Sequence, residues 1–275
     1  MRSSTLRQSL RIISVLVVLG IAVFPLYWMF VTSLTSDSDL FSTSPHLLPD
    51  LTRLGTYADA WSGRVPRWLL NSLTIASGTA LLTALLAIPF GYALSRFRFF
   101  GKAALLLGLF LTQMLPEALL VVPLFSLFSQ FDLLNSLHGL VLVDTAFTLP
   151  IVVFILKGAF DGIPKELEEA ASVDGCSAFG TLVRISLPLI APSIAATAVI
   201  AFFAGWNEYI FAVTFAFDAA IQPASVGLAS FIGELSTPVQ TVMSVAVMYT
   251  LPAVVFYLLA QKYIVSGMTA GGVKG

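Results

Sequence analysis

Polar side chains that could contact a cargo interrupt otherwise apolar stretches of this sequence at three places. Gln113 and Glu117 lie one helical turn apart beside a proline, and Asp144 follows in the next apolar run. The third place is a consecutive run of an aromatic, an amide and a carboxylate: Trp206, Asn207 and Glu208. A carboxylate at membrane depth is costly and marks a functional site by default, and amide and carboxylate groups beside an aromatic face suit a sugar. These six residues are our candidate contacts with a substrate or along a translocation path.

Each candidate also has a purely structural interpretation. Glu117 could be protonated or paired where helices pack, and Asp144 could be partly solvated near the outer end of its helix. Trp206 could belong to the aromatic belt at a membrane surface. The residue types alone leave both interpretations open.

A second polar group, residues 161–188, has the pattern of two short helices. Pro164 suits a first helical turn and is followed by glutamates, which complement the helix dipole. Gly175 is expected to end the first helix, and Ser177 to cap a second that Pro188 limits. Helical spacing places Glu169 outward, nearly opposite a face made of Leu167, Ala170, Ala171 and Asp174. We interpret these residues as a docking element for another protein.

The composition indicates that these groups belong to an integral membrane protein. Of the 275 residues 57% are hydrophobic and 11% are charged, whereas soluble proteins carry about 25% charged residues. The net charge of −1 gives no reason to expect a nucleic acid partner. The single cysteine, Cys176, excludes an internal disulfide and is interpreted as a small buried residue.

The apolar runs predict an all-α membrane protein with six transmembrane helices in one domain, residues 1–275. Each run has about the 20 residues that a spanning helix requires. The expected spans are 12–34, 68–94, 103–127, 139–160, 190–215 and 239–262. The first run is too long for the apolar region of a secretory signal, so we interpret it as a retained anchor. Asn71, near the start of the second span, is expected to be a packing or capping amide.

The basic residues predict the orientation of the bundle. With the N-terminus inside, eleven of the 14 lysines and arginines fall in inside segments and three outside. Both termini and the docking element are therefore expected to be cytoplasmic. The outer loops would be 35–67, 129–138 and 216–238.

No pattern of an enzyme is visible. The sequence shows no nucleophile triad and no cluster of metal ligands, so neither catalytic nor metal-binding residues are predicted. Gly101-Lys102 lacks the flanking residues of a phosphate-binding loop. If transport uses ATP, another chain must bind the nucleotide.

The docking element resembles the EAA loop of binding-protein-dependent ABC importer permeases. The match consists of Glu169-Ala170-Ala171, Gly175, Ile185 and Leu187-Pro188 at the spacing of that motif. The whole chain is similar to the smaller inner-membrane permease of maltose-type carbohydrate importers. Further matching stretches are Asn71-Ser72, Gly91–Phe97, Trp206–Tyr209 and Gly267–Gly275.

This resemblance implies the type I ABC importer permease fold and a set of partners. The loop would be a coupling helix seated on an ATPase subunit, through Glu169, Ala170, Ala171, Asp174, Gly175, Ile185, Leu187 and Pro188. The partners would be a second, larger permease, two copies of an ATPase that bind ATP and Mg, and an extracytoplasmic sugar-binding protein. The binding protein would be contacted through Gln222, Pro223 and Gly233. The location would be the cytoplasmic membrane of a bacterium or archaeon.

Two other functions remain open at this stage. One is an ABC permease for a different polar solute, such as a glycerophosphodiester. The other is an ion-coupled secondary transporter that works alone through Glu117 and Asp144. The second alternative leaves the docking element unexplained and lacks a visible inverted repeat.

Overall fold

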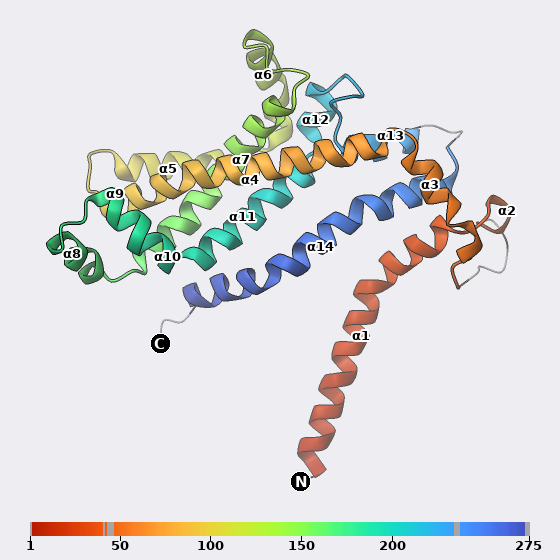
Figure 1. The fold of residues 1–275 in the computed structure, drawn as a ribbon, viewed down its shortest axis with the longest axis horizontal. Coiled ribbons are helices and arrows are strands. Elements are labelled where there is room, and N and C mark those ends of the chain that lie inside the picture. The colour runs from red at the N-terminus through yellow and green to blue at the C-terminus, as the bar shows by residue number, and fades with distance from the viewer. Residues whose placement is uncertain (1, 41, 43–46, 234–236, 273–275) are drawn as a thin grey trace. The chain divides into compact units, whose positions relative to one another are not determined.

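The computed structural model describes residues 2–40, 42, 47–233 and 237–272, and within these ranges every regular element is a helix (Figure 1). The contacts within the chain cluster into two compact units. Unit 1 comprises Met1–Pro66 and Leu228–Leu251, and unit 2 comprises Arg67–Gly227 and Pro252–Gly275. The helices of a membrane protein can form separate contact units, because lipid covers their apolar sides as effectively as neighbouring helices do.

Unit 1 begins with a long helix whose described residues from Leu10 to Tyr27 are exposed. Its elements are α1 (Arg2–Ser33), α2 (Asp37–Leu40), η1 (Leu51–Arg53) and α3 (Gly55–Trp61). None of the most apolar window of α1 is buried within the chain. Near its end the helix is anchored, since the Tyr27 hydroxyl donates to the Leu47 carbonyl and the Ser33 hydroxyl lies 2.6 Å from that of Tyr57. Burial raises the pKa of Tyr57, and the hydrogen bond to Ser33 partly opposes that shift.

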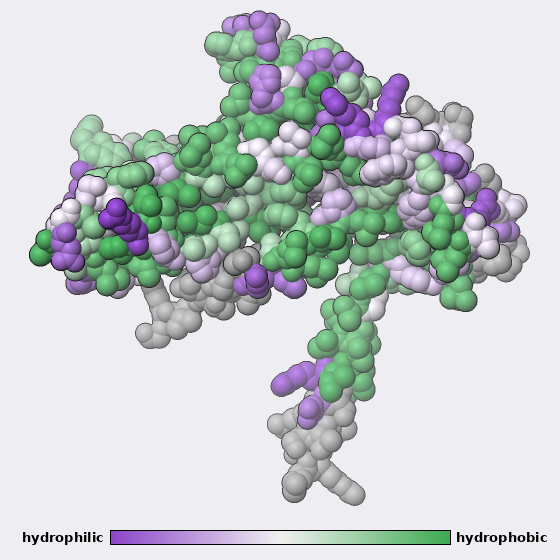
Figure 2. Space-filling model, in the orientation of Figure 1, coloured by the Kyte–Doolittle hydropathy of each residue, from purple (hydrophilic) through white to green (hydrophobic). Residues whose placement is uncertain are grey.

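Unit 2 contains most of the remaining helices, with α4, α13 and α14 extending across the boundary. The helices are α4 (Val65–Arg96), α5 (Lys102–Thr112), α6 (Glu117–Gln130), α7 (Leu137–Asp161), α8 (Lys165–Val173), α9 (Ala178–Thr181), η2 (Leu182–Ser186), α10 (Leu187–Leu189), α11 (Ala191–Trp206), α12 (Ile210–Phe215), α13 (Ala224–Gly233) and α14 (Val239–Gly272). Figure 2 shows hydrophobic residues over the exposed sides of α4 and α5. Such a surface is expected of helices that face lipid or another membrane subunit.

Small residues let the helices of unit 2 approach one another closely. A Cβ atom on Gly205 of α11 would lie 2.9 Å from the Cα of Ala76 in α4. A Cβ on Gly78 would lie 2.8 Å from Val141 of α7. Gly91 near the end of α4 similarly faces the backbone of α7 at Lys157. These contacts show that α4 packs through a face of small residues.

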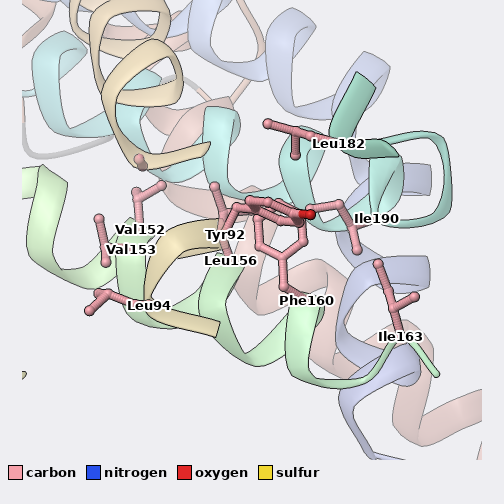
Figure 3. Packing of buried hydrophobic residues seen from close by; sticks show 10 residues of the cluster. Tyr92, Leu94, Val152, Val153, Leu156, Phe160, Ile163, Leu182 and Ile190 are labelled. Carbon is pink, nitrogen blue, oxygen red and sulfur yellow. The ribbon is translucent and has the colours of Figure 1, made fainter. Parts of the chain in front are cut away.

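Two apolar clusters hold opposite ends of unit 2. At the end that carries the docking element, Tyr92 packs edge-on against Phe160 with ring centroids 5.3 Å apart. Leu182 of the docking element and Ile190, which follows it, belong to the same cluster (Figure 3). The other cluster joins α6 to α12 through Phe128, Phe211 and Phe215, and α7 contributes Leu140 and Val143 to it.

Two of the expected spans are not continuous helices. The span expected at 103–127 consists of α5 and α6, which are bent by 103° at residues 113–116. The span expected at 190–215 consists of α11 and α12, separated by Asn207, Glu208 and Tyr209. Within the described residues, five helical segments are long and apolar enough to cross a membrane, or six if the bent pair is one span. The predicted all-α membrane fold is therefore confirmed, and the third expected span contains a bend that was not predicted from the sequence.

Candidate functional site

The docking element folds as two helices around a left-handed glycine. Gly175 has φ +84°, which an L side chain rarely adopts. The Cys176 N–H donates to the Ala171 carbonyl at 2.9 Å and thereby closes the end of α8. The Ser177 hydroxyl then accepts a hydrogen bond from the Gly180 N–H at 3.2 Å, as an N-cap does. The geometry expected for this turn is present.

The second helix continues past the position where a proline would ordinarily end it. Residues Leu182–Ser186 form a π-helical turn, in which the Leu187 N–H donates to the Leu182 carbonyl. The altered hydrogen-bond pattern accommodates Pro188, and the helical run ends at Leu189. Ile185 and Leu187 are half-buried on this turn and Pro188 is exposed.

The face that α8 turns inward differs from the expected face. Glu169 is exposed as predicted, but Leu167, Ala170 and Asp174 are exposed too, and Ala171 alone of the expected face is buried. The physical reason is that the neighbouring carboxylate, Glu168, is held inside by an arginine. The outer surface of the element therefore combines a carboxylate with apolar groups, including Val173 at 87% exposure and Phe179 at 75%.

The inward carboxylate joins three segments of unit 2. Glu168 Oε2 accepts a hydrogen bond from Arg96 Nε at 2.6 Å, and Oε1 accepts one from the Ser186 hydroxyl at 2.8 Å. The two charged side chains are 9% and 12% exposed. Arg96 also donates to the Ile163 carbonyl at 3.2 Å, so the guanidinium at the end of α4 also holds the backbone that leads into α8.

Three carboxylates line a cavity of about 320 Å³ in unit 2. Glu117 contributes from the first turn of α6, Asp144 from α7, and Glu208 from the break between α11 and α12. The lining residues are Glu117, Asp144, Phe147, Thr148, Ala204, Asn207, Glu208, Tyr209, Ile210 and Phe211, with no lysine or arginine among them. The structure thus brings together four of the six candidate contacts.

The buried state of Asp144 and the role of Glu208 were not foreseen. Asp144 is 4% exposed rather than partly solvated, because it lies well inside the contact of α7 with its neighbours. Glu208 Oε1 accepts hydrogen bonds from the N–H groups of Phe211 at 2.6 Å and Ala212 at 3.3 Å, and so caps α12. This cap explains why a carboxylate stands at the break between two apolar helices.

Two other candidate contacts lie elsewhere. Trp206 is 1% exposed and stacks on Phe202, with ring centroids 5.9 Å apart. It therefore belongs to the protein core and neither borders the cavity nor lies in a surface belt. The Gln113 amide donates to the Phe147 carbonyl at 3.0 Å, where it ties the bend after α5 to α7.

Hydrogen bonds to α4 hold the first part of the segment that is expected to contact a binding protein. The buried Asn71 amide donates to the carbonyls of Ala220 and Gln222, both at 2.9 Å. This geometry is that of a packing amide, as expected.

The side chain of Gln222 turns back to the Ala216 carbonyl at 3.2 Å, and Pro223 is buried. Gly233 is the last residue of α13. In this segment Phe217, 66% exposed, is more accessible than Gln222 or Pro223.

Comparison with known families decides the identity. Residues 85–270, which include the docking element and the carboxylate cavity, match the family of binding-protein-dependent transport system inner membrane components. The chain belongs to this family. It is a permease subunit of ABC transporters, as the resemblance of its EAA loop predicted.

Curated relatives match nearly the whole permease. It is 37% identical to the trehalose/maltose transport system permease protein of Thermococcus litoralis, over 100% of both chains. It is 32% identical to the sulfoquinovosyl glycerol transport system permease protein of Agrobacterium fabrum, over 98% of this chain and 94% of that protein.

A solved structure supports the fold independently. One chain of a bacterial ABC transporter involved in the import of the acidic polysaccharide alginate superposes with a TM-score of 0.82. The match covers 96% of this permease and 98% of that chain, at 20% identity. At this identity the likeness concerns the fold, and it confirms the ABC importer permease architecture.

Proposed function

We propose that this permease forms half of the translocation pathway of an ATP-driven sugar importer and receives the motion of an ATPase through residues 161–188. The observation that carries the proposal is the exposed surface of α8 and α9. It presents the Glu169 carboxylate beside the apolar Val173 and Phe179 at the end of a membrane bundle. Exposed apolar groups on a polar segment are typical of a protein interface.

The distribution of basic residues supports a cytoplasmic position for this surface. Lys157, Lys165 and Arg184 lie within or next to residues 161–188 in the sequence. Arg96, Arg98 and Lys102 lie at or just after the end of α4, which the Arg96–Glu168 ion pair joins to α8. Such an excess is typical of the cytoplasmic side of a membrane protein. The partners would be a second, larger permease, two ATPase subunits that bind ATP and Mg, and an extracytoplasmic sugar-binding protein, in a bacterial or archaeal cytoplasmic membrane.

The cargo class is inferred from the relatives together with the cavity. The relatives are named for transport of trehalose and maltose and of sulfoquinovosyl glycerol, and another is a diacetylchitobiose uptake permease of Streptomyces coelicolor. Carboxylate and amide groups at the cavity, from Glu117, Asp144 and Asn207, suit the hydroxyl groups of a sugar. A glycerophosphodiester is less favoured, because the lining residues include no lysine or arginine to meet its phosphate.

The mechanism follows from the rigid packing of unit 2. Binding of ATP would bring the two ATPase subunits together and displace the α8–α9 surface seated on one of them. Since this surface packs on α4 and α7, its displacement would rock the bundle against the partner permease and open the path to the outside. The permease itself would supply the path and the coupling, with hydrolysis on the ATPase chains.

A pull-down from native membranes tests the proposal. Wild-type permease in mild detergent should bring a second permease and an ATPase, and the purified assembly should hydrolyse ATP. Glu169→Lys should lose the ATPase while keeping the second permease, because the reversed charge lies on the exposed surface. Glu166→Lys, an equal charge change on the same helix but outside the motif, is the matched control and should retain the ATPase. Recovery of the wild-type chain without an ATPase would refute the proposal.

A further inference from the structure

The buried ion pair between Arg96 and Glu168 lies behind the docking surface and cannot itself contact an ATPase. The two side chains are 9% and 12% exposed, whereas the adjacent Glu169 is exposed. A buried ion pair seldom adds net stability over apolar packing, so stability alone gives little reason for one here. The ion pair lies between the end of α4, the segment that leads into α8 and the π-helical turn, and this position indicates its role.

Each polar group of the pair contacts a different part of unit 2. Glu168 belongs to α8, and its two oxygens accept hydrogen bonds from Arg96 at the end of α4 and from Ser186 in the π-helical turn. Arg96 reaches back to the Ile163 carbonyl between α7 and α8. A single carboxylate therefore ties both helices of the docking element to the end of α4.

A second set of contacts continues the connection to α7. Arg96 Nη1 donates to the Ser95 hydroxyl at 3.1 Å, and that hydroxyl donates to Asp161 Oδ1 at 2.6 Å. Asp161 is the last residue of α7 and also accepts from Lys157 at 2.6 Å. The ends of two long helices and the docking element are thus linked by one chain of charged and hydroxyl groups.

The apolar packing beneath the element does not supply the same constraint. Leu182 and Ile190 lie against Tyr92 and Phe160 and resist separation of the element from the bundle (Figure 3). Apolar contacts are non-directional, so they restrain rotation and sliding weakly. Charge-assisted hydrogen bonds with fixed geometry restrain both, because their strength depends on the donor angle.

We propose that Arg96, Glu168 and Ser186 form a joint that makes the docking element move as one body with α4 and α7. The joint converts a displacement of the α8–α9 surface into movement of the translocation path, and without it the element would shift on the bundle. Arg96 and Glu168 are positioning residues in this role, since they act through the exposed surface rather than at it. The inference rests on the proposed ATPase coupling and adds the residues that transmit it.

The test measures transport per ATP hydrolysed by the complete importer in proteoliposomes. The variants are Glu168→Gln and Arg96→Gln, their double variant, and the exchange Arg96→Glu with Glu168→Arg. Glu166→Gln, an exposed change of the same kind on α8, is the control. Loss of a hydrogen bond to a charged group predicts that each single variant lowers transport per ATP about tenfold or more. The ATPase should still co-purify, because the exposed surface is unchanged.

Three results together would support the joint. The double variant should be no worse than either single one, the exchange should recover part of the lost transport, and Glu166→Gln should behave as wild type. A role only in stability would lower the amount of assembled importer instead, and would leave transport per ATP unchanged in the fraction that assembles.

Several results would overturn the inference. These are unchanged transport per ATP in the single variants, effects that add in the double variant, or loss of the ATPase from the assembly in the single variants. Each would leave the proposed function intact, provided that the wild-type importer couples hydrolysis to uptake. A wild-type chain that assembles with no ATPase would instead remove the proposed function on which the inference rests.

Discussion

Glu168 and Glu169 are adjacent residues of one chemical type that occupy opposite environments. Glu169 is exposed on the outer side of α8, whereas Glu168 accepts hydrogen bonds from Arg96 and Ser186 inside the fold. Successive helical residues differ by about 100° around the axis, so only one of the two can face a partner. The exposed one fits docking, and the buried one fits attachment of the element to its own bundle.

Gly175 permits a test of the turn that separates α8 from α9. Gly175→Ala should strain the left-handed backbone at φ +84° by about 1–2 kcal/mol, although its Cβ would meet nothing within 4 Å. We expect normal membrane insertion but reduced ATP-driven uptake, measured in proteoliposomes with the assembled partners. Gly158→Ala in α7, where a Cβ is equally free of neighbours, is the control and should transport normally. Equal uptake by both variants would show that the turn geometry is not needed for coupling.

The sequence predicts the outward direction of Glu169 because helical periodicity within one segment determines it. It cannot place Glu168, because the arginine that draws it inward is 72 residues away in the chain. The same limit applies to Asp144, whose burial depends on how α7 packs. It applies to Trp206 as well, whose ring lies on Phe202 in the core. Side-chain types predict candidate regions, and tertiary contacts determine which atoms in those regions are exposed.

At the scale of elements, breaks inside apolar runs determine where polar groups meet. The run 103–127 is long enough for one span, and its hydropathy gives no sign of the 103° bend. The bend follows from Pro116, which precedes α6 with an extended backbone and cannot continue the preceding helix. It places Glu117 in the first turn of α6, and from there Glu117 reaches the cavity that Asp144 and Glu208 also line.

Hydrogen bonds from Asn71 of α4 hold the segment that follows α12 in place. Asn71→Ala removes two hydrogen bonds and leaves the carbonyls of Ala220 and Gln222 without this donor. We expect a loss of about 2–3 kcal/mol in the free energy of unfolding, and faster proteolysis at 216–222, with both measured in detergent. Thr74→Ala is the control, since that exposed hydroxyl bonds only to Leu70 of its own helix. A melting temperature equal to that of the control would argue against a pinning role for Asn71.

At the scale of the whole molecule, the apolar surfaces indicate a subunit rather than a self-sufficient transporter. The apolar window of α1 has no buried residue, and apolar side chains of α4, α5 and α6 are widely exposed. Some of this surface suits lipid, but the docking surface on α8 and α9 does not, because it combines apolar groups with a carboxylate. Because a surface of this kind is typical of a protein interface, we expect the chain to receive its energy from another protein, as proposed above.

Reconstitution of the chain alone tests this dependence against the secondary-transporter alternative. In vesicles with a pH or sodium gradient, the chain without partners should move no radiolabelled maltose or trehalose, and Glu117→Ala should behave identically. Addition of the second permease, the ATPase and the loaded binding protein should produce uptake that requires ATP. The physical reason is that, in the proposed mechanism, the cavity lined by the three carboxylates becomes part of a path that would open only when the subunits rock. Gradient-driven flux by the isolated chain that disappears in Glu117→Ala would assign ion coupling to that carboxylate. The docking surface would in that case need another explanation.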